Sequence, residues 1–260
     1  MTQISGKTAA SSPKRVRADQ LLVEQGLAAS RSQAQALILA GVVRSGPDSV
    51  VAKASQLLAT EAKLSVDQPP RFVSRGGEKL AAFLEKFSVD AKNAHALDLG
   101  ASTGGFTDCL LQRGAAEVTC VDVGRAQLHA KLRGDARVTN LEKINARELG
   151  AVKLPRENYD IVVIDVSFIS LTKILPAAWA RVREGGRLIA LIKPQFEATK
   201  AEASAGRGVI RDAEIQQRIF TGIKNFAETE LAGAKNFGEL ESPILGGDGN
   251  REFLAGWEKA

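Results

Sequence analysis

The alternation of strand-like and helix-like segments after residue 93 constrains the fold of this chain more than any other feature. Short runs rich in Val, Ile and Leu predict buried strands, and longer amphipathic runs between them predict helices. This order is typical of an α/β domain, in which helices cover both faces of a parallel sheet. Strands are expected over 94–99, 117–123, 138–141, 159–165 and 187–192, and helices over 104–113, 171–184 and 212–229.

A helix and a hairpin complete this predicted domain. The amphipathic segment VSRGGEKLAAFLEKF, which begins at Val73, predicts a helix before the first strand. The last two strand-like runs, near 236–244 and 251–257, are joined by the short segment GGDGN. A connection of this length joins antiparallel neighbours, because parallel strands need a longer crossover. We therefore predict a Rossmann-like α/β sheet that is mostly parallel and has an antiparallel hairpin at one edge.

The first 72 residues differ from the rest of the chain in charge. They hold nine Lys and Arg against five Asp and Glu, whereas residues 73–260 hold 26 against 25. This imbalance favours a module that binds a polyanion and is joined to a near-neutral body. Scattered solubilising charge is the alternative.

Residues 15–66 predict a small α+β module. The segments RVRADQLLVEQG and SRSQAQALILAG predict two short helices that end at Gly26 and Gly41, and VVRSGPDSVVAK predicts two short strands around a turn. The pattern resembles that of S4-type RNA-binding domains. This resemblance implies that an arginine-lined face grips folded ribosomal RNA, largely through phosphates, and a face that only meets solvent is the alternative. The arginines expected on this face are Arg15, Arg17, Arg31 and Arg44.

Two segments flank this module. Residues 1–14 are expected to form a disordered tail, because they contain no apolar run. Residues 67–72 are expected to form a linker, because consecutive prolines extend neither a strand nor a helix. The larger predicted domain then covers residues 73–260.

The sequence gives no indication of a membrane protein or of a metal-binding protein. It contains no apolar run of the about 18–20 residues that span a bilayer, and its N-terminus lacks the apolar core of a secretory signal. Cys109 and Cys120 lack the spacing of metal ligands and are expected to be buried thiols in a reducing cytoplasm. We therefore expect a cytoplasmic protein without membrane insertion and without a metal site.

The segment ALDLGASTGGFTD, residues 96–108, predicts a strand, a glycine-rich loop and the start of a helix. Its glycines at Gly100, Gly104 and Gly105 indicate that a nucleoside ligand or a tight turn lies close to the backbone. A dinucleotide fingerprint needs glycine at position 102, where this chain has Ser102. The missing glycine is the one that lets the backbone approach a pyrophosphate, so an NAD-type oxidoreductase is disfavoured.

Acidic residues at two strand ends favour a different nucleoside cofactor. Asp98 suits a positively charged ligand, and Asp122 is placed to accept hydrogen bonds from ribose hydroxyls. S-Adenosylmethionine carries an adenosine, an ammonium and a sulfonium but no phosphate, and it therefore fits both residues. Asn145, after the third strand, is expected to hydrogen-bond the adenine edge. The alternatives are a helix cap or turn for Asp98 and a plain strand-end acid for Asp122.

Four charged residues from remote segments are expected at one edge of the sheet, where the ligands of open α/β sheets bind. Asp165 and Lys193 each end a predicted strand, Lys79 lies early on the helix before the first strand, and Glu252 opens the last strand. We therefore expect two carboxylates and two amines to converge near the sulfonium.

The motifs of the larger domain together resemble those of the TlyA (hemolysin A) family, in which an S4 domain precedes an FtsJ-like methyltransferase domain. The resemblance rests on DLGASTGGFTD, VIDVSFISL, LIKPQFEA, GVIRD and GNREF and covers nearly the whole chain. It implies a class I methyltransferase fold and ribose 2′-O-methylation of ribosomal RNA, with cytidine targets in ribosomal subunits. It also implies a catalytic tetrad formed by Lys79, Asp165, Lys193 and Glu252.

The resemblance also bears on the cofactor loop. Thr103 stands where many FtsJ-like relatives have proline, which points to the TlyA branch. Phe106, and Phe168 in the next motif, are expected to pack into the core more readily than to stack on a base. The residues expected to contact the cofactor are Asp98, Gly100, Ser102, Thr103, Gly104, Gly105, Phe106, Asp122 and Asn145.

The chemistry of ribose methylation explains the residue types of the tetrad. A 2′-hydroxyl becomes nucleophilic as its proton is withdrawn, and the neutral thioether that leaves needs no general acid. We hypothesise that Lys193 is the base, that Asp165 orients it, and that Glu252 fixes Lys79 or the ribose. A structural salt bridge is the alternative for Lys193. For the whole chain, the alternative is an RNA-binding or assembly factor with a vestigial methyltransferase fold. The family name also suggests a pore-forming protein, but the sequence contains no segment that could span a membrane.

Overall fold

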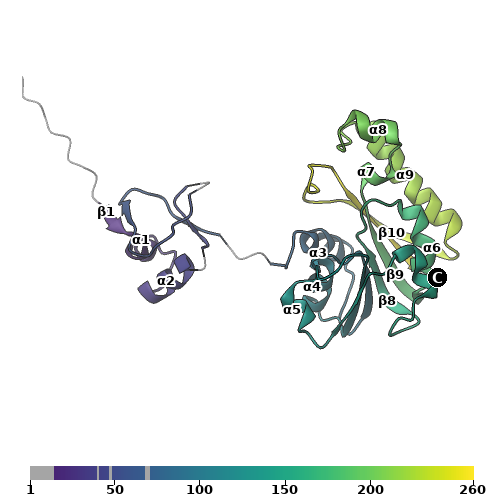
Figure 1. The fold of residues 1–260 in the computed structure, drawn as a ribbon, viewed down its shortest axis with the longest axis horizontal. Helices are drawn as coiled ribbons and strands as arrows, with labels where there is room; N and C mark the ends of the chain where they lie inside the picture. Colours follow the sequence, from purple (N-terminus) through teal and green to yellow (C-terminus); the bar gives the residue numbers. More distant parts are fainter. Residues whose placement is uncertain (1–14, 40, 47–48, 68–70) are drawn as a thin grey trace, which may run out of the picture. The chain divides into compact units, whose positions relative to one another are not determined.

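The computed structural model describes residues 15–39, 41–46, 49–67 and 71–260 (Figure 1). The chain divides into two compact units, Met1–Pro69 and Pro70–Ala260. The predicted tail over 1–14, the Pro47-Asp48 part of the predicted turn and residues 68–70 of the predicted linker lie outside the described residues. We describe each unit by itself.

The first unit packs two helices against short antiparallel strands. Leu21, Leu22 and Ile38 are buried between its helices and strands. β1 pairs with β3, and β2 pairs with β4. Its elements are β1 (Arg15–Arg17), α1 (Ala18–Glu24), α2 (Arg31–Leu39), β2 (Val43–Arg44), β3 (Leu57–Ala59) and β4 (Ser65–Val66).

A local signal accounts for the start of α2. Ser30 Oγ accepts a hydrogen bond from the Gln33 backbone N–H at 3.2 Å, as expected at a helix start. The predicted second strand of the 42–53 segment is reduced to a single bridge between Arg44 and Val50. The strand that pairs with β2 comes instead from Ser65 and Val66, which are distant in sequence.

A seven-stranded sheet forms the centre of the second unit, in the order β10-β11-β9-β8-β5-β6-β7. The pairs among β5 to β9 are parallel, whereas β11 pairs antiparallel with both β9 and β10. The predicted Rossmann-like sheet with an antiparallel edge hairpin is confirmed. The strands are β5 (His95–Leu99), β6 (Glu117–Asp122), β7 (Val138–Glu142), β8 (Tyr159–Ile164), β9 (Val182–Ile192), β10 (Ala234–Glu241) and β11 (Phe253–Lys259).

Helices cover both faces of this sheet (Figure 1). Because side chains alternate along a strand, Val163 packs with Phe83 on one face and Val162 packs with Trp179 on the other. The first face is covered by α3 (Gly76–Lys86), α4 (Gly105–Gln112) and α5 (Ala130–Arg133), and the second by α6 (Leu175–Trp179) and α9 (Ala213–Glu230). The remaining short elements are η1 (Ala146–Ala151), η2 (Leu171–Lys173), α7 (Pro194–Glu197) and α8 (Lys200–Ala205).

The predicted helix over 171–184 is wrong in its second half. The segment forms η2 and α6, and β9 already begins at Val182. Val182 pairs with Tyr159, and the register then shifts so that Arg187 pairs with Ile161. Gly185, at a φ of +68°, allows the backbone to accommodate the extra residues of this bulge. Residues 183–187, which lie between the apolar parts of β9, are charged or glycine, so the sequence there does not show the apolar pattern of a buried strand.

The predicted linker over 67–72 overlaps folded structure at both ends. Asp67 forms an ion pair with Arg44 in the first unit. Phe72 is buried in the core of the second unit, and the Val73 backbone N–H donates to Asp108 Oδ2 at 2.9 Å. No helix in the described part of the chain is long and apolar enough to cross a membrane.

Candidate active site

The glycine loop after β5 lies so close to neighbouring parts of the protein that its glycine positions have no room for a side chain. A Cβ atom on Gly100 would lie 2.4 Å from the Asp165 carbonyl oxygen, and one on Gly105 would lie 2.3 Å from Ser74 Oγ. Gly104 has a φ of +95°, in the left-handed region that favours glycine. The atoms that exclude side chains at these positions belong to the protein itself. The loop therefore joins β5, β8 and the start of α3 at one corner of the sheet.

A cavity of about 320 Å³ lies beside this loop, at the carboxyl ends of β5, β6 and β8. Val123, Ile144 and Ile169 give it apolar walls, and Asp122 and Asn145 add polar groups. Asp122 Oδ2 accepts the Ser102 backbone N–H at 2.8 Å, and its Oδ1 accepts the Gly124 backbone N–H at 2.6 Å. These bonds fix the carboxylate at the cavity.

Asn145 lies at the start of η1 in the same cavity wall. Its Oδ1 accepts the Arg147 backbone N–H at 3.1 Å and so caps this turn. The side chain therefore has a structural role. Its Nδ2 group is left for the contact with an adenine edge that the sequence predicts.

A second cavity, of about 220 Å³, lies on the other side of the loop. Gly100, Ser102 and Asp165 line both cavities, so the two share one wall. Lys79 and Asp98 line only the second. The predicted loop residues Thr103, Gly105 and Phe106 also line it, and Phe106 is at the same time part of the core.

Asp98 is the buried acidic group of the second cavity. Its side chain is fully buried, and its Oδ2 accepts a hydrogen bond from Thr107 Oγ1 at 2.6 Å. Its Oδ1 has no hydrogen-bond partner among the described residues. Burial raises the pKa of this carboxyl to about 7, and the nearby Asp165 carboxylate adds to the rise, while the Thr107 hydrogen bond opposes it. A half-satisfied buried carboxylate of this kind suits a cationic ligand group.

Lys79 and Glu252 form a buried ion pair. Their side chains are 10% and 2% exposed, and they come from α3 and from the residue just before β11. The pair thus joins segments that are separated by 173 positions in the sequence.

Lys193 and Asp165 form a second, more accessible ion pair. Lys193 Nζ lies 2.6 Å from Asp165 Oδ1, and the two side chains are 12% and 22% exposed. Lys193 Nζ also donates to Ser167 Oγ at 3.0 Å. The pair forms because β8 and β9 are neighbouring parallel strands that end at the same edge. Asp165 and Lys79 line the second cavity, and Lys193 and Glu252 are linked to it as their ion-pair partners.

Phe168 was expected in the core, and this expectation is wrong. Its side chain is 91% exposed at the edge of the larger cavity, and its φ of +63° is unusual for a bulky residue. The ring packs on Phe196 with a centroid distance of 4.9 Å. Glu197 holds the adjoining loop, since its carboxylate accepts hydrogen bonds from the Ser170 hydroxyl at 2.6 Å and the Leu171 N–H at 2.7 Å. The position of Phe168 three residues after the strand-end acid Asp165 is the signal that could have identified it.

The predicted RNA-binding arginines lie in the first unit and are treated separately. Asp19 is fully buried and forms ion pairs with Arg17 at 2.9 Å and Arg31 at 3.3 Å. Arg44 is paired with Asp67. Arg15 lies exposed on β1. Three of the four arginines are therefore held by carboxylates in the structure.

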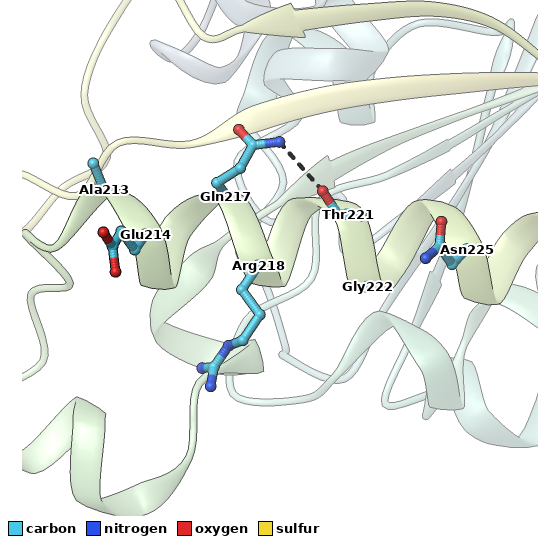
Figure 2. A pocket seen from close by; sticks show the side chains of 7 residues that line it. All are labelled: Ala213, Glu214, Gln217, Arg218, Thr221, Gly222 and Asn225. Atoms are coloured by element: carbon cyan, nitrogen blue, oxygen red, sulfur yellow. Dashed lines mark hydrogen bonds between the residues drawn. The ribbon is translucent and has the colours of Figure 1, made fainter.

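Another hollow in the second unit contains none of the predicted residues. It measures about 780 Å³ and runs along the outer face of α9, from Ala213 to Asn225 (Figure 2). Gln217 bonds to Thr221 on this face, and Arg218 extends toward α8, where it meets Glu202 at 2.7 Å. One helix lines this hollow, without converging polar groups, so we place the site at the sheet edge. Within the described ranges, no group of three or more His, Cys, Asp and Glu could hold a metal ion.

Comparisons with known proteins agree with this geometry. The family model described as FtsJ-like methyltransferase matches residues 72–259. "Hemolysin A" of Brachyspira hyodysenteriae is 41% identical over 240 residues, which are 92% of this chain and 98% of that protein. "16S/23S rRNA (cytidine-2'-O)-methyltransferase TlyA" of Mycobacterium tuberculosis is 42% identical over 93% of this chain and 89% of its own length. The solved structure of a candidate hemolysin from Streptococcus thermophilus, 39% identical, superposes with a TM-score of 0.69 over 95% of this chain and 89% of that one.

Proposed function

This chain belongs to the FtsJ-like methyltransferase family, and we propose that it transfers a methyl group from S-adenosylmethionine to a ribose 2′-hydroxyl of ribosomal RNA. The observation that carries the proposal is the meeting of two Lys–carboxylate pairs beside a cavity that holds a half-satisfied buried carboxylate. A buried ion pair such as Lys79–Glu252 can serve stability alone, but a structural role does not explain why a second Lys–carboxylate pair lies beside the same cavity.

The cavities fit the chemical groups of S-adenosylmethionine. When bound, this cofactor supplies a methyl group on a positively charged sulfur. Asp98 Oδ1 would receive the ammonium, which is a natural partner for an otherwise unpaired buried carboxylate. Asp122, fixed by two backbone N–H groups, would bind the ribose hydroxyls, and the apolar walls around Ile144 would enclose the adenine.

The tetrad would activate and hold the acceptor hydroxyl. Lys193 Nζ would act as the base in its neutral amine form: after giving up an ammonium proton to solvent it would take the proton of the 2′-hydroxyl, and Asp165 and Ser167 would hold that nitrogen in place. Lys79, held by Glu252, would stabilise negative charge as it develops on the ribose oxygen. General-base help is typically worth about 10²–10⁴-fold, whereas alignment of the reactants can contribute about 7–11 kcal/mol. Positioning by both ion pairs is therefore the larger part of the proposed catalysis.

The proposed substrate is a cytidine in ribosomal RNA, as the name of the M. tuberculosis relative says of that protein. The exposed Phe168 ring at the edge of the site is suited to stack on an unpaired base. We further propose that residues 15–66 act as an S4-like module that binds RNA phosphates in ribosomal subunits, with Arg15, Arg17, Arg31 and Arg44 on its contact face.

Mapping of ribose 2′-O-methyl groups tests this proposal. Unmethylated ribosomal subunits are incubated with S-adenosylmethionine, with and without the protein, and the RNA is then cleaved with alkali. A 2′-O-methyl group blocks cleavage, so we expect protein-dependent protection at a cytidine. A folded protein that binds the subunits without protecting any ribose would favour the RNA-binding alternative instead.

A further inference from the structure

Asn250 is a buried polar residue that neither the tetrad nor the cofactor site includes. It lies two residues before Glu252, in the loop between β10 and β11, and it is only 1% exposed. Its Oδ1 accepts the Ile210 backbone N–H at 2.9 Å, and its Nδ2 donates to the Gly208 carbonyl oxygen at 2.9 Å. The side chain thus pairs with the main chain of a remote segment much as a neighbouring strand would.

The segment that Asn250 binds is itself firmly held. The Ile210 carbonyl accepts a hydrogen bond from Gln216 Nε2 at 2.6 Å, and both residues are buried. Asp212 caps α9 by accepting the backbone N–H groups of Glu214 and Ile215. Because α9 packs on the sheet, residues 208–212 give Asn250 a fixed point of attachment.

The loop around Asn250 is shaped to enclose Glu252. The Asn250 carbonyl accepts the Gly246 N–H at 2.8 Å, and the Glu252 carbonyl accepts the Ser242 N–H at 2.8 Å. A Cβ atom on Gly246 would lie 2.4 Å from Glu252 Oε1, so this loop passes directly over the carboxylate. A shift of the loop would therefore move Glu252 relative to Lys79.

We infer that Asn250 is a positioning residue for methyl transfer: it fastens the β10–β11 loop to residues 208–210 and so holds Glu252 against Lys79. The inference rests on the proposed function, because it assigns Asn250 a role that acts through the Lys79–Glu252 pair. The Asn250 side chain fits this role by shape, since an amide supplies one acceptor and one donor to the two backbone groups. Aspartate would keep the acceptor and lose the donor.

The test compares kcat for methyl transfer in Asn250→Ala and Asn250→Asp with that of the unchanged protein. A misplacement of about 1 Å can cost about 100-fold, so we expect Asn250→Ala to lower kcat by about 10- to 100-fold and Asn250→Asp, which sets a carboxylate oxygen against the Gly208 carbonyl, by at least as much. The affinity for S-adenosylmethionine, measured by calorimetry, should stay within about 3-fold, because Asn250 lines neither cavity. Thr119→Val, which removes a buried hydrogen bond to Tyr159, controls for a general loss of stability.

A double-substitution cycle separates positioning from a general structural role. If Asn250 acts through Glu252, then Asn250→Ala should change kcat by less than about 3-fold when Glu252→Gln is already present. An equal loss in both backgrounds, or an equal loss in Thr119→Val, would overturn the inference. Full activity of Asn250→Ala would overturn it as well and leave the proposed function intact, whereas an inactive unchanged protein would refute both.

Discussion

The two ion pairs at the sheet edge use the same residue types but lie in different surroundings. Lys79 and Glu252 are buried and come from segments at opposite ends of the second unit. Lys193 and Asp165 follow neighbouring strands, are more exposed, and share Ser167 as a further contact. The two amines are about equally accessible, at 10% and 12%, so the difference lies in their carboxylates: Glu252 is 2% exposed and Asp165 is 22% exposed.

This difference suggests a division of labour within the tetrad. Breaking a buried pair leaves an uncompensated charge in the interior, so the fold itself depends on Lys79 and Glu252. The Lys193–Asp165 pair is expected to contribute less to stability, because its carboxylate is 22% exposed whereas that of Glu252 is 2% exposed. We therefore expect substitutions of Lys79 or Glu252 to affect stability and activity together, and substitutions of Lys193 or Asp165 to affect activity more than stability.

The largest effect is expected for Lys193→Ala. Loss of the proposed base should lower kcat by about 10²–10⁴-fold, while the affinity for S-adenosylmethionine changes little and the melting temperature falls by less than in Lys79→Ala. Single-turnover methyl transfer, calorimetry and thermal unfolding provide the three measurements. Lys224→Ala is the matched control, since Lys224 pairs with Glu239 away from both cavities. Activity within about 3-fold of the unchanged protein would assign Lys193 to a structural salt bridge.

Lys79→Ala should lower stability as well as activity. It leaves Glu252 buried without its partner, and we expect the free energy of unfolding to fall by about 3–5 kcal/mol in urea titrations. Replacing both residues with apolar side chains, as in Lys79→Met with Glu252→Leu, should restore much of this stability without restoring activity. The comparison fails if Lys79→Ala is as stable as the unchanged protein.

The pH dependence of cofactor binding should reveal Asp98. Its pKa is about 7 in the free protein because of burial, whereas a bound ammonium requires the ionised form. Below pH 7 binding must therefore release a proton, and affinity should rise by up to about tenfold per pH unit until it levels off near pH 7. Calorimetry in buffers with different ionisation heats measures this proton release. Asp98→Asn should bind more weakly and without this pH dependence; a pH-independent affinity of the unchanged protein would contradict the assignment.

The smallest effect is expected in the first unit, for Arg15→Ala. Loss of one phosphate contact should weaken RNA binding a few-fold and reduce the slope of log affinity against log salt by about 0.7–0.9. At saturating RNA, kcat should stay unchanged, since the module is proposed to bind and not to react. An unchanged salt slope would remove Arg15 from the contact face.

The sequence predicted the sheet well because strands such as β5 and β8 are buried and carry a strong apolar signal. The sequence-based prediction of a helix over 171–184 failed at its end. There the start of β9 is separated from the rest of the strand by a bulge, and it is defined as a strand by the pairing of Val182 with Tyr159. The four charged residues could be assigned to one edge from topology alone. Three features could not be predicted, because each depends on neighbours that are distant in sequence. These are the unpaired Oδ1 of Asp98, the exposure of Phe168 and the contacts of Asn250.

The central claim is that both ion pairs serve a single ribose hydroxyl. The most direct test uses a ribosomal RNA fragment that the protein methylates, with the target cytidine replaced by 2′-deoxycytidine. We predict that methyl transfer from S-adenosylmethionine is lost while the fragment still binds with similar affinity. Transfer to the deoxy fragment at an undiminished rate would show that the methyl group goes elsewhere, and it would contradict the account.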